Sequence, residues 1–298
     1  MGMVEVVVIG SYCHDVGLRV ESFPSPGETV FGSDILESHG GKGSNQAINV
    51  RRAGHSVAFV CAIGDDAKGH GAVDLWRSED LDTSLTLIKS DGPTGMALIV
   101  IAASGENQII VSPGANALLR PQDLAPARNC IANTSLVLSQ LEVPTDTVVE
   151  AFRLARIAGA VTVLNAAPAL SVIPDTLWAN LDLLIVNETE AQQLTGCTSN
   201  DYVQLCALLI SRVRLGVVIT CGPLGAIGIN AQGELIRVAA PNVEVVDTTG
   251  AGDAFVGAFC SGWLRTRDLR ASMQLGTASG SLACTTRGAL PPSLLPVH

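Results

Sequence analysis

The sequence predicts a three-layer α/β/α fold, a mostly parallel sheet between two layers of helices, with a small inserted β-sheet lid. Short, continuously apolar segments alternate with helical segments, the pattern of parallel strands buried on both faces and joined by helical crossovers. Two segments, at about residues 16–38 and 94–112, interrupt this alternation with strand-like pieces around turn residues. We expect these segments to form the lid, with edge strands of the main sheet as the alternative.

Each element follows from a local pattern. Buried strands are expected at the short apolar runs Val4–Ile9, Val57–Ala62, Leu136–Leu141, Val161–Asn165, Leu183–Val186 and Val217–Thr220. Helices are expected between or after them at Asn45–Ala53, Gly71–Glu79, Thr145–Ala158, Glu188–Thr195 and about 251–264. In the second lid segment, Gly95–Ile101 and Asn107–Val111 flank a turn, so we expect a hairpin there and antiparallel strands in both lid segments.

The composition indicates a single domain that spans residues 1–298. The chain is 47% hydrophobic and 15% charged, which is typical of a compact protein. Its net charge is −10 and no basic cluster stands out, so nucleic-acid binding is not expected. No apolar run approaches about 18 residues and no basic segment precedes the first strand, so we expect neither a membrane span nor a signal peptide. Eight scattered cysteines without metal-ligand spacing favour free thiols in the cytoplasm.

Residues 247–255 read DTTGAGDAF and carry the strongest functional signal. A strand expected at Val243–Val246 leads into a glycine-rich turn, and the following helix has Asp253 in its first turn. Unpaired N–H groups at a helix N-terminus bind anions, and a carboxylate there can accept a proton from a nucleophile. The alternative is that Asp253 only stabilises the helix end. Phe255 occupies the third glycine position of a dinucleotide-binding motif, so that motif is excluded.

A second glycine loop, GGKGSN at residues 40–45, also precedes a helix, for which Ser44 is a plausible N-cap. Its glycines would let a polar ligand approach the backbone, and Lys42 and Asn45 could donate to hydroxyl oxygens. Gly43 follows Lys42 where a Walker A loop has Ser or Thr, so that motif is excluded. A purely structural turn is the alternative.

Two other strand ends carry polar or glycine residues. Asn187 follows a buried strand and Glu190 lies three residues further, so the pair could serve a hydrated Mg²⁺ or form a capping box. The segment Thr220–Gly225 contains two glycines and could bind phosphates or only turn the chain.

In this order, the motifs resemble those of the ribokinase-like (PfkB) family of carbohydrate kinases. The resemblance runs from about Val4 to Pro291 and rests on GGKG at 40–43, NETE at 187–190 and DTTGAGD at 247–253. It implies a three-layer α/β domain with a β lid, often dimeric through the lid sheets. It also implies phosphorylation of ribose at its 5-hydroxyl with ATP and Mg²⁺, activated by K⁺.

The resemblance assigns roles residue by residue. Asp253 resembles the catalytic base, and Gly250, Ala251 and Gly252 resemble the anion hole. The sugar-binding residues would be Asp15, Gly41, Lys42, Asn45, Glu142 and Asp253. The nucleotide-binding residues would be Asn187, Thr220, Gly222, Gly225 and Thr277. Glu190 would organise Mg²⁺, and K⁺ would be bound by Asp247 with the carbonyl groups of Thr249, Ala283, Thr286 and Gly288.

Four features depart from the family pattern. Cys13 stands where bacterial members usually have an asparagine that contacts the sugar, and Thr277 where many have Asn or His near adenine. A serine expected in the K⁺ loop falls at Pro292, next to Ser293. The chain ends at His298, where many relatives continue with a final helix, and this difference concerns the nucleotide side.

Three alternatives to a ribose kinase follow from the same residues. One is a kinase of 2-deoxyribose or another pentose. A second is a nucleoside kinase, which is less favoured because the pair Lys42 and Glu142 suits the hydroxyls of a free sugar. A third is a catalytically silent sugar-binding regulator, against which the intact Asp253 and anion hole argue.

Overall fold

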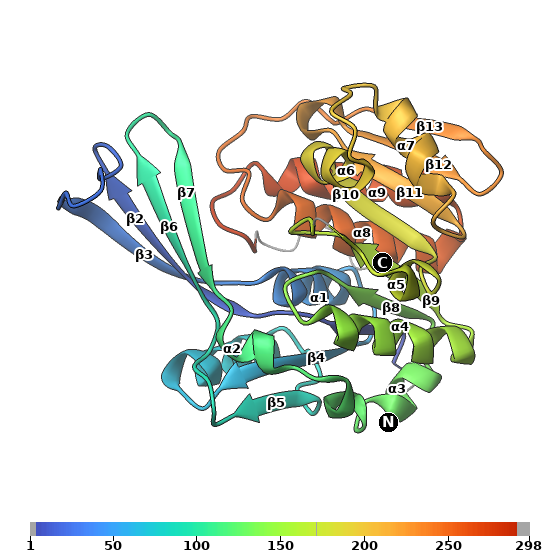
Figure 1. The fold of residues 1–298 in the computed structure, drawn as a ribbon, viewed down its shortest axis with the longest axis horizontal. Helices are drawn as coiled ribbons and strands as arrows, with labels where there is room; N and C mark the ends of the chain where they lie inside the picture. The colour runs from blue at the N-terminus through green and yellow to red at the C-terminus, as the bar shows by residue number, and fades with distance from the viewer. Residues whose placement is uncertain (1–3, 171, 291–298) are drawn as a thin grey trace.

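The computed structural model describes residues 4–170 and 172–290, and within them the chain forms two separate sheets flanked by helices (Figure 1). The main sheet has nine strands in the order β13-β12-β11-β10-β9-β8-β1-β4-β5. In chain order they are β1 Val6–Ile9, β4 Val57–Gly64, β5 Thr86–Lys89, β8 Leu136–Ser139, β9 Val161–Asn165, β10 Leu183–Asn187, β11 Gly216–Thr220, β12 Ala226–Asn230 and β13 Leu235–Val238. The six buried strands that the sequence predicts all belong to this sheet.

From β5 at one edge to β11, neighbouring strands of this sheet pair in parallel, and only the pairs β11–β12 and β12–β13 at the other edge are antiparallel. The chain leaves β1 first towards β4 and β5, and later returns on the other side of β1 to β8. Such a change of direction opens a crevice at the carboxyl ends of the strands, which is where open α/β sheets bind ligands.

Helices cover both faces of the main sheet, as the three-layer prediction requires. Successive residues of β1 point to opposite faces, so Val7 and Ile9 join one buried core and Val6 and Val8 join the other. The first core packs against α3 Arg128–Ala132, α4 Thr145–Ala158, α5 Asp175–Trp178, α6 Glu188–Thr195 and α7 Tyr202–Ile210. The second packs against α1 Lys42–Arg52, α2 Ala67–Ser78, α8 Ala251–Thr266 and α9 Leu269–Ala283.

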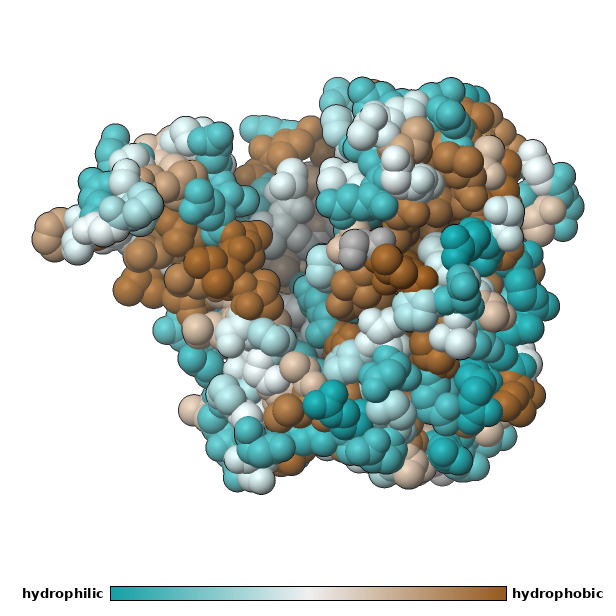
Figure 2. Space-filling model, viewed as in Figure 1, coloured by the Kyte–Doolittle hydropathy of each residue, from teal (hydrophilic) through white to brown (hydrophobic). Residues whose placement is uncertain are grey.

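The small sheet projects from the body, and the molecule is hollowed between the two (Figures 1 and 2). Its order is β3-β2-β6-β7, with the bounds β2 Cys13–Val20, β3 Gly32–Gly40, β6 Met96–Ala102 and β7 Asn107–Ser112. The predicted hairpin is confirmed as β6 and β7. The alternative of edge strands in the main sheet is wrong.

The expectation of antiparallel strands in both lid segments is confirmed, because β2 pairs antiparallel with β3 and β6 with β7. The two segments join each other through a parallel pair, β2 and β6. The topology gives the reason. β2 follows β1 and β6 follows β5, and these two strands of the main sheet share one direction. Both connections therefore leave the carboxyl ends of parallel strands, and β2 and β6 enter the small sheet in the same direction.

Two local predictions are wrong. Val243–Val246 is not a strand, although its residues are β-branched. The N–H groups of Val246 and Asp247 donate to the carbonyl of Cys284, just after α9, and not to a strand, and Val243 and Val245 line a cavity. Ser44 is not the N-cap of α1, because the helix begins earlier, at Lys42, with Gly41 as its N-cap.

No helix within the described ranges is long and apolar enough to cross a membrane.

Candidate active site

The glycine-rich turn before α8 aims the start of that helix at the crevice. Gly250 is the N-cap with φ 75°, and a Cβ atom there would lie 2.4 Å from the carbonyl oxygen of Ala289, so only glycine fits. The N–H of Ala251 donates to the carbonyl of Thr248 over 3.2 Å. The N–H groups of Gly252 and Asp253 have no acceptor among the described residues. They are the unpaired donors that a helix offers to an anion.

The first glycine loop brings the start of α1 against the segment that follows β1. Gly41 has φ 85°, and a Cβ atom there would lie 2.6 Å from the backbone nitrogen of Cys13. Because the helix begins at Lys42, Ser44 lies inside its first turn, where it is buried and accepts a hydrogen bond from Trp76 Nε1 over 2.8 Å. The loop therefore packs tightly on backbone.

Asp253 lies where α1 and α8 meet. Its carboxylate is buried, and its two oxygens accept hydrogen bonds from Asn45 Nδ2 and Gln46 Nε2, each over 2.9 Å. A buried carboxylate needs such partners, and both are provided by neighbouring residues of one helix. Asp253 is therefore fixed in place and retains lone pairs for a further donor.

Lys42 lies among four carboxylates without touching any of them. No ion pair within 4.0 Å forms between its ammonium group and the described residues. Burial by itself would lower the pKa of Lys42, but this effect is outweighed, and the pKa is raised, by the negative charges of Asp253, Glu142, Glu190 and Asp15. The cation thus remains charged and available for an anionic or hydroxyl ligand in the crevice.

Asp15 and Glu142 form the acidic wall of the same crevice. Burial, together with the charges of Glu142 and Asp253, raises the pKa of Asp15 to about 7, against a smaller lowering by Lys42. Glu142 Oε2 accepts hydrogen bonds from the backbone N–H of Lys42, over 2.9 Å, and from the hydroxyl of Ser11. Segments that follow β1 and β8 thus meet at the point where the strand order reverses.

The pair Asn187 and Glu190 forms a capping box at the start of α6. Asn187 Oδ1 accepts from the N–H of Glu190, and Glu190 Oε2 accepts from the N–H of Asn187, both over 2.8 Å. Burial raises the pKa of Glu190, and the charge of Asp253 adds to this effect, although the hydrogen bond from Asn187 and the charge of Lys42 oppose it. Glu190 therefore shares the electrostatic environment of Asp253 and Lys42 while it caps the helix.

A cavity of about 600 Å³ opens beside the N-terminus of α8. Four of the predicted nucleotide-binding residues line it together with Ala251 and Gly252, namely Thr220, Gly222, Gly225 and Thr277. Asn187 does not line it, although its strand pairs with β11 in a register that places Asn187 beside Thr220. The hydroxyl of Thr277 is buried and has no partner among the described residues. A ligand that fills the cavity could provide that partner.

Three of the residues predicted to bind K⁺, Asp247, Thr249 and Gly288, are joined by hydrogen bonds beside the same turn. Asp247 Oδ1 accepts from the N–H and the hydroxyl of Thr249, over 2.9 and 2.7 Å, and Oδ2 accepts from the N–H of Gly288 over 2.9 Å. These hydrogen bonds lower the pKa of Asp247, although burial opposes them. Pro292 and Ser293, which the resemblance relates to the K⁺ loop, lie outside the described residues.

The cysteines and the acids form no other obvious centre. All eight cysteines are free thiols. Within the described ranges, no group of three or more His, Cys, Asp or Glu side chains is placed to hold a metal ion.

Several residues of the site escaped the sequence analysis. Gln46, which donates to the carboxylate of Asp253, and Asn165, which accepts from Gln46, were not singled out. Gln140, which donates to Gln46, was given no role. Ser11 was also missed. Gln46 stands next to Asn45 in the glycine-loop motif, and this position was the only available signal.

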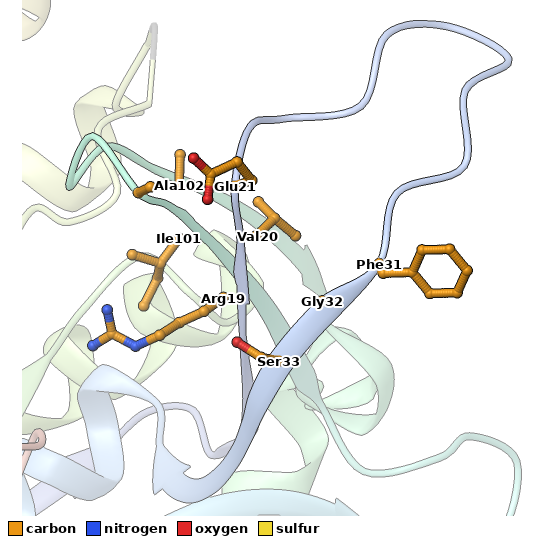
Figure 3. Close-up of a pocket in the computed structure, with 9 residues that line it drawn as sticks. Arg19, Val20, Glu21, Phe31, Gly32, Ser33, Ile101 and Ala102 are labelled. Atoms are coloured by element: carbon orange, nitrogen blue, oxygen red, sulfur yellow. The ribbon is translucent and has the colours of Figure 1, made fainter.

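A second hollow, of about 480 Å³, lies at the far end of the small sheet, between the strand ends that carry Arg19, Ser33 and Ile101 (Figure 3). None of the predicted site residues lines it. Phe31 marks its rim and is almost fully exposed.

Comparisons with known proteins agree with this fold and show the family. Residues 3–295 match the pfkB family carbohydrate kinase family. The ribokinase of Staphylococcus aureus is 34% identical to this chain over 96% of the chain and 95% of the relative. The deoxyribokinase of Salmonella typhimurium is 30% identical over 95% of the chain and 94% of the relative.

Among solved structures, that of Arabidopsis thaliana ribokinase complexed with ribose and ATP superposes with a TM-score of 0.90 at 28% identity, and covers 98% of this chain and 95% of the relative. The two-sheet architecture and the full-length match in sequence thus point the same way. The chain belongs to the pfkB family of carbohydrate kinases.

Proposed function

We propose that this protein transfers the γ-phosphoryl group of ATP to the 5-hydroxyl of D-ribose and releases ADP and ribose 5-phosphate. One observation carries the proposal: the carboxylate of Asp253 lies in the first turn of α8, between the unpaired N–H groups of that turn and the polar wall formed by Asp15, Lys42 and Glu142. A sugar hydroxyl and a phosphoryl group can therefore meet beside one base. The full-length similarity to ribokinases supports ribose as the acceptor.

The proposed reaction needs one base and a positive environment. Asp253 accepts the proton of the 5-hydroxyl, and the oxygen forms a bond to the γ-phosphorus while the bond from that phosphorus to the β-phosphate oxygen breaks. Negative charge develops on the transferred group. The N–H groups of Gly252 and Asp253 lie beside it and stabilise this charge. Lys42 contributes its charge from the sugar side.

The nucleotide would occupy the cavity of about 600 Å³, with its phosphates towards Gly252. The end of β11 and the turn after it line this cavity with Thr220, Gly222 and Gly225, and Thr277 offers its unpartnered hydroxyl from α9. Asn187 would reach the nucleotide from the end of β10, next to Thr220.

The residues present fit the Mg²⁺ ion that the family implies. Glu190 Oε2 is used in the capping box, whereas Oε1 receives no hydrogen bond from the described residues and is free to bind water or metal. A single carboxylate with ordered waters is the donor set that Mg²⁺ usually takes when it accompanies a nucleotide. The ion would neutralise charge on the phosphates.

The loop around Asp247 fits a K⁺ ion in the same way. The carbonyl oxygens of Thr249, Thr286 and Gly288 receive no hydrogen bond from the described residues, and Asp247 adds a negative charge beside two of them. The carbonyl of Ala283 accepts only long hydrogen bonds, both from Thr286, over 3.4 Å from its N–H and 3.5 Å from its hydroxyl. Carbonyl oxygens and one carboxylate suit a large, weakly charged cation, which would hold the turn that leads into α8.

We further propose that the small sheet, from about residues 16–38 and 94–112, closes over the sugar as a lid within one domain and that it forms a homodimer. Asp15 lies on one face of β2, so Val16 lies on the other, in a row with Leu98 and Ile110 on the paired strands. Ile110 is 66% exposed, and apolar surface gathers on this sheet in Figure 2. A second copy would bury that row.

Equilibrium sedimentation tests the dimer: the wild-type protein should sediment as a dimer and Ile110→Asp as a monomer, and a monomeric wild type would refute the proposal.

The eight free thiols fit the predicted cytoplasmic location.

A specific observation favours a second candidate, the phosphorylation of 2-deoxyribose. Cys13 is 4% exposed and lies close enough to Asp15 and Glu142 for their charges to raise the pKa of its thiol, after burial, to about 12. A neutral thiol is a weak hydrogen-bond partner for a sugar hydroxyl. The similarity to a deoxyribokinase points in the same direction.

A coupled assay for ADP with a panel of pentoses and ATP tests the proposed function. The expected result is turnover with the highest kcat/KM for ribose. Higher kcat/KM for 2-deoxyribose would select the second candidate. Sugar binding by calorimetry without any turnover would instead identify a silent regulator.

A further inference from the structure

Both oxygens of the Asp253 carboxylate are held by side-chain amides of α1, from Asn45 and Gln46. The contact depends on the close approach of α1 and α8 at Gly257, where a Cβ atom would lie 2.4 Å from Cβ of Asn49. Asn45 and Asp253 each lie one turn before this crossing on their own helices, so the same approach brings them together.

The side chain of Gln46 is wholly buried, and both polar atoms of its amide are used. Its Oε1 accepts from Gln140 Nε2 over 2.6 Å, and its Nε2 donates to Asn165 Oδ1 as well as to Asp253 Oδ1, over 2.9 Å each. Rotating this amide by half a turn would set its oxygen against the oxygens of Asn165 and Asp253. Only the observed orientation therefore satisfies the network.

The partners of Gln46 are fixed to the main sheet. Asn165 ends β9, and its Nδ2 donates to the carbonyl of Ile185 in β10 over 3.1 Å. Gln140 directly follows β8. Gln46 is thus held at the carboxyl ends of neighbouring parallel strands. Its hydrogen bond to Asp253 therefore fixes the carboxylate relative to the main sheet. Asn45 has no comparable anchor, since its Oδ1 is buried without a partner among the described residues.

We propose that Gln46 is a positioning residue for Asp253: it sets the rotation of the carboxylate so that a lone pair faces the hydroxyl to be phosphorylated. Gln46 does not line the nucleotide cavity, so it acts through Asp253. The inference rests on the proposed function, because the rotation matters for the rate only if Asp253 accepts a proton. Misplacement of a reacting group by ~1 Å costs on the order of 10²-fold in rate.

The test compares Gln46→Met with Thr147→Val. Gln46→Met keeps most of the volume and removes the donor to Asp253. Thr147 is also wholly buried and donates one hydrogen bond, to the carbonyl of Leu119, but it lies on α4 away from the site, so Thr147→Val controls for the loss of a buried hydrogen bond. We expect kcat to fall roughly 10–10²-fold in Gln46→Met with KM for ribose within about threefold, and to stay unchanged in Thr147→Val. An unchanged kcat in Gln46→Met would overturn the inference.

A second variant keeps the test valid if Gln46→Met fails to fold. Gln46→Glu has nearly the same shape and can still accept from Gln140, but it sets an oxygen where Nε2 donates to Asp253. Its kcat should fall further than that of Gln46→Met. A kcat equal to that of the wild type would again overturn the inference.

A double-mutant cycle separates positioning from general destabilisation. In an Asp253→Asn background, the added change Gln46→Met should lower kcat by less than about twofold, because the base that it positions is already absent. A full multiplicative loss in the double variant would mean that Gln46 acts independently of Asp253.

A crystal structure of Gln46→Met distinguishes failure of this inference from failure of the proposed function. If the wild type phosphorylates no sugar, the proposed function fails, and the structure still decides the positioning: a rotated Asp253 carboxylate supports it, and an unmoved carboxylate refutes it.

Discussion

Asn45 and Asp253 are 208 residues apart in the chain and joined by a hydrogen bond of 2.9 Å between Nδ2 and Oδ2. This bond links the first glycine loop, through α1, to the glycine turn that begins α8. The residue proposed to contact the sugar thus touches the residue proposed to deprotonate it. Binding of the acceptor and placement of the base are coupled by one contact, and the predictions below follow from this arrangement.

Asp253→Asn should lower kcat by at least ~10²-fold, in the range that general-base catalysis contributes. Asparagine keeps the shape of the side chain but cannot accept the proton, so ribose binding measured by calorimetry should be largely retained. Asp146→Asn provides a matched control, since Asp146 is also an acid in the first turn of a helix, α4, and lies outside the site. Near-normal turnover of Asp253→Asn would remove Asp253 as the base.

Glu190→Gln should weaken the response of the rate to Mg²⁺ more than it weakens ribose affinity. The variant keeps the shape of the capping box but removes the charge that faces Lys42. Glu188→Gln is the control, because Glu188 shares the first turn of α6 but accepts a hydrogen bond from the hydroxyl of Tyr202. If the Mg²⁺ titrations of Glu190→Gln and wild type superimpose, Glu190 only caps the helix.

Replacing Na⁺ by K⁺ at constant ionic strength should raise the rate. A cation bound by Asp247 and its neighbouring carbonyl groups would hold the turn that presents Gly250 and the first N–H groups of α8. Asp247→Asn should abolish the difference between the two salts. Equal rates of the wild type in both salts would exclude the site.

Cys13→Asn should raise the preference for ribose over 2-deoxyribose, measured as the ratio of kcat/KM values. An asparagine can donate to and accept from the 2-hydroxyl, and sites built for such bonds reject the analogue that lacks the hydroxyl. The thiol is close enough to contact an amide, since Asn116 Nδ2 lies 3.8 Å from its sulfur. An unchanged ratio would show that Cys13 only packs and does not read the sugar.

Asp15→Asn should raise the Tm of the ligand-free protein more at pH 8 than at pH 5. Burial and the charges of Glu142 and Asp253 raise the pKa of Asp15 to about 7, well above that of an unfolded Asp. The folded state therefore favours the protonated acid, and that contribution to stability is lost as the pH rises through 7. Asparagine mimics the neutral form, so the difference in Tm between variant and wild type should grow with pH. A difference in Tm that is the same at both pH values would contradict the shifted pKa.

The sequence by itself determined the alternation of strands and helices, the family and the order of its motifs, because these depend on local patterns. α4 and α6 begin and end where the sequence predicts, as does β9, since apolar periodicity and turn residues mark their ends. The start of α8 at Ala251 was likewise predicted from the glycine turn.

Only the tertiary structure decided which distant residues meet. Val243–Val246 has the composition of a strand but pairs with no strand, and Ser44 has the chemistry of a cap but is buried against Trp76. The contact of Gln46 with Asn165 and Asp253 depends on how closely two helices cross over the ends of the sheet. Packing of surfaces that are far apart in the chain sets such contacts, and no local pattern encodes them.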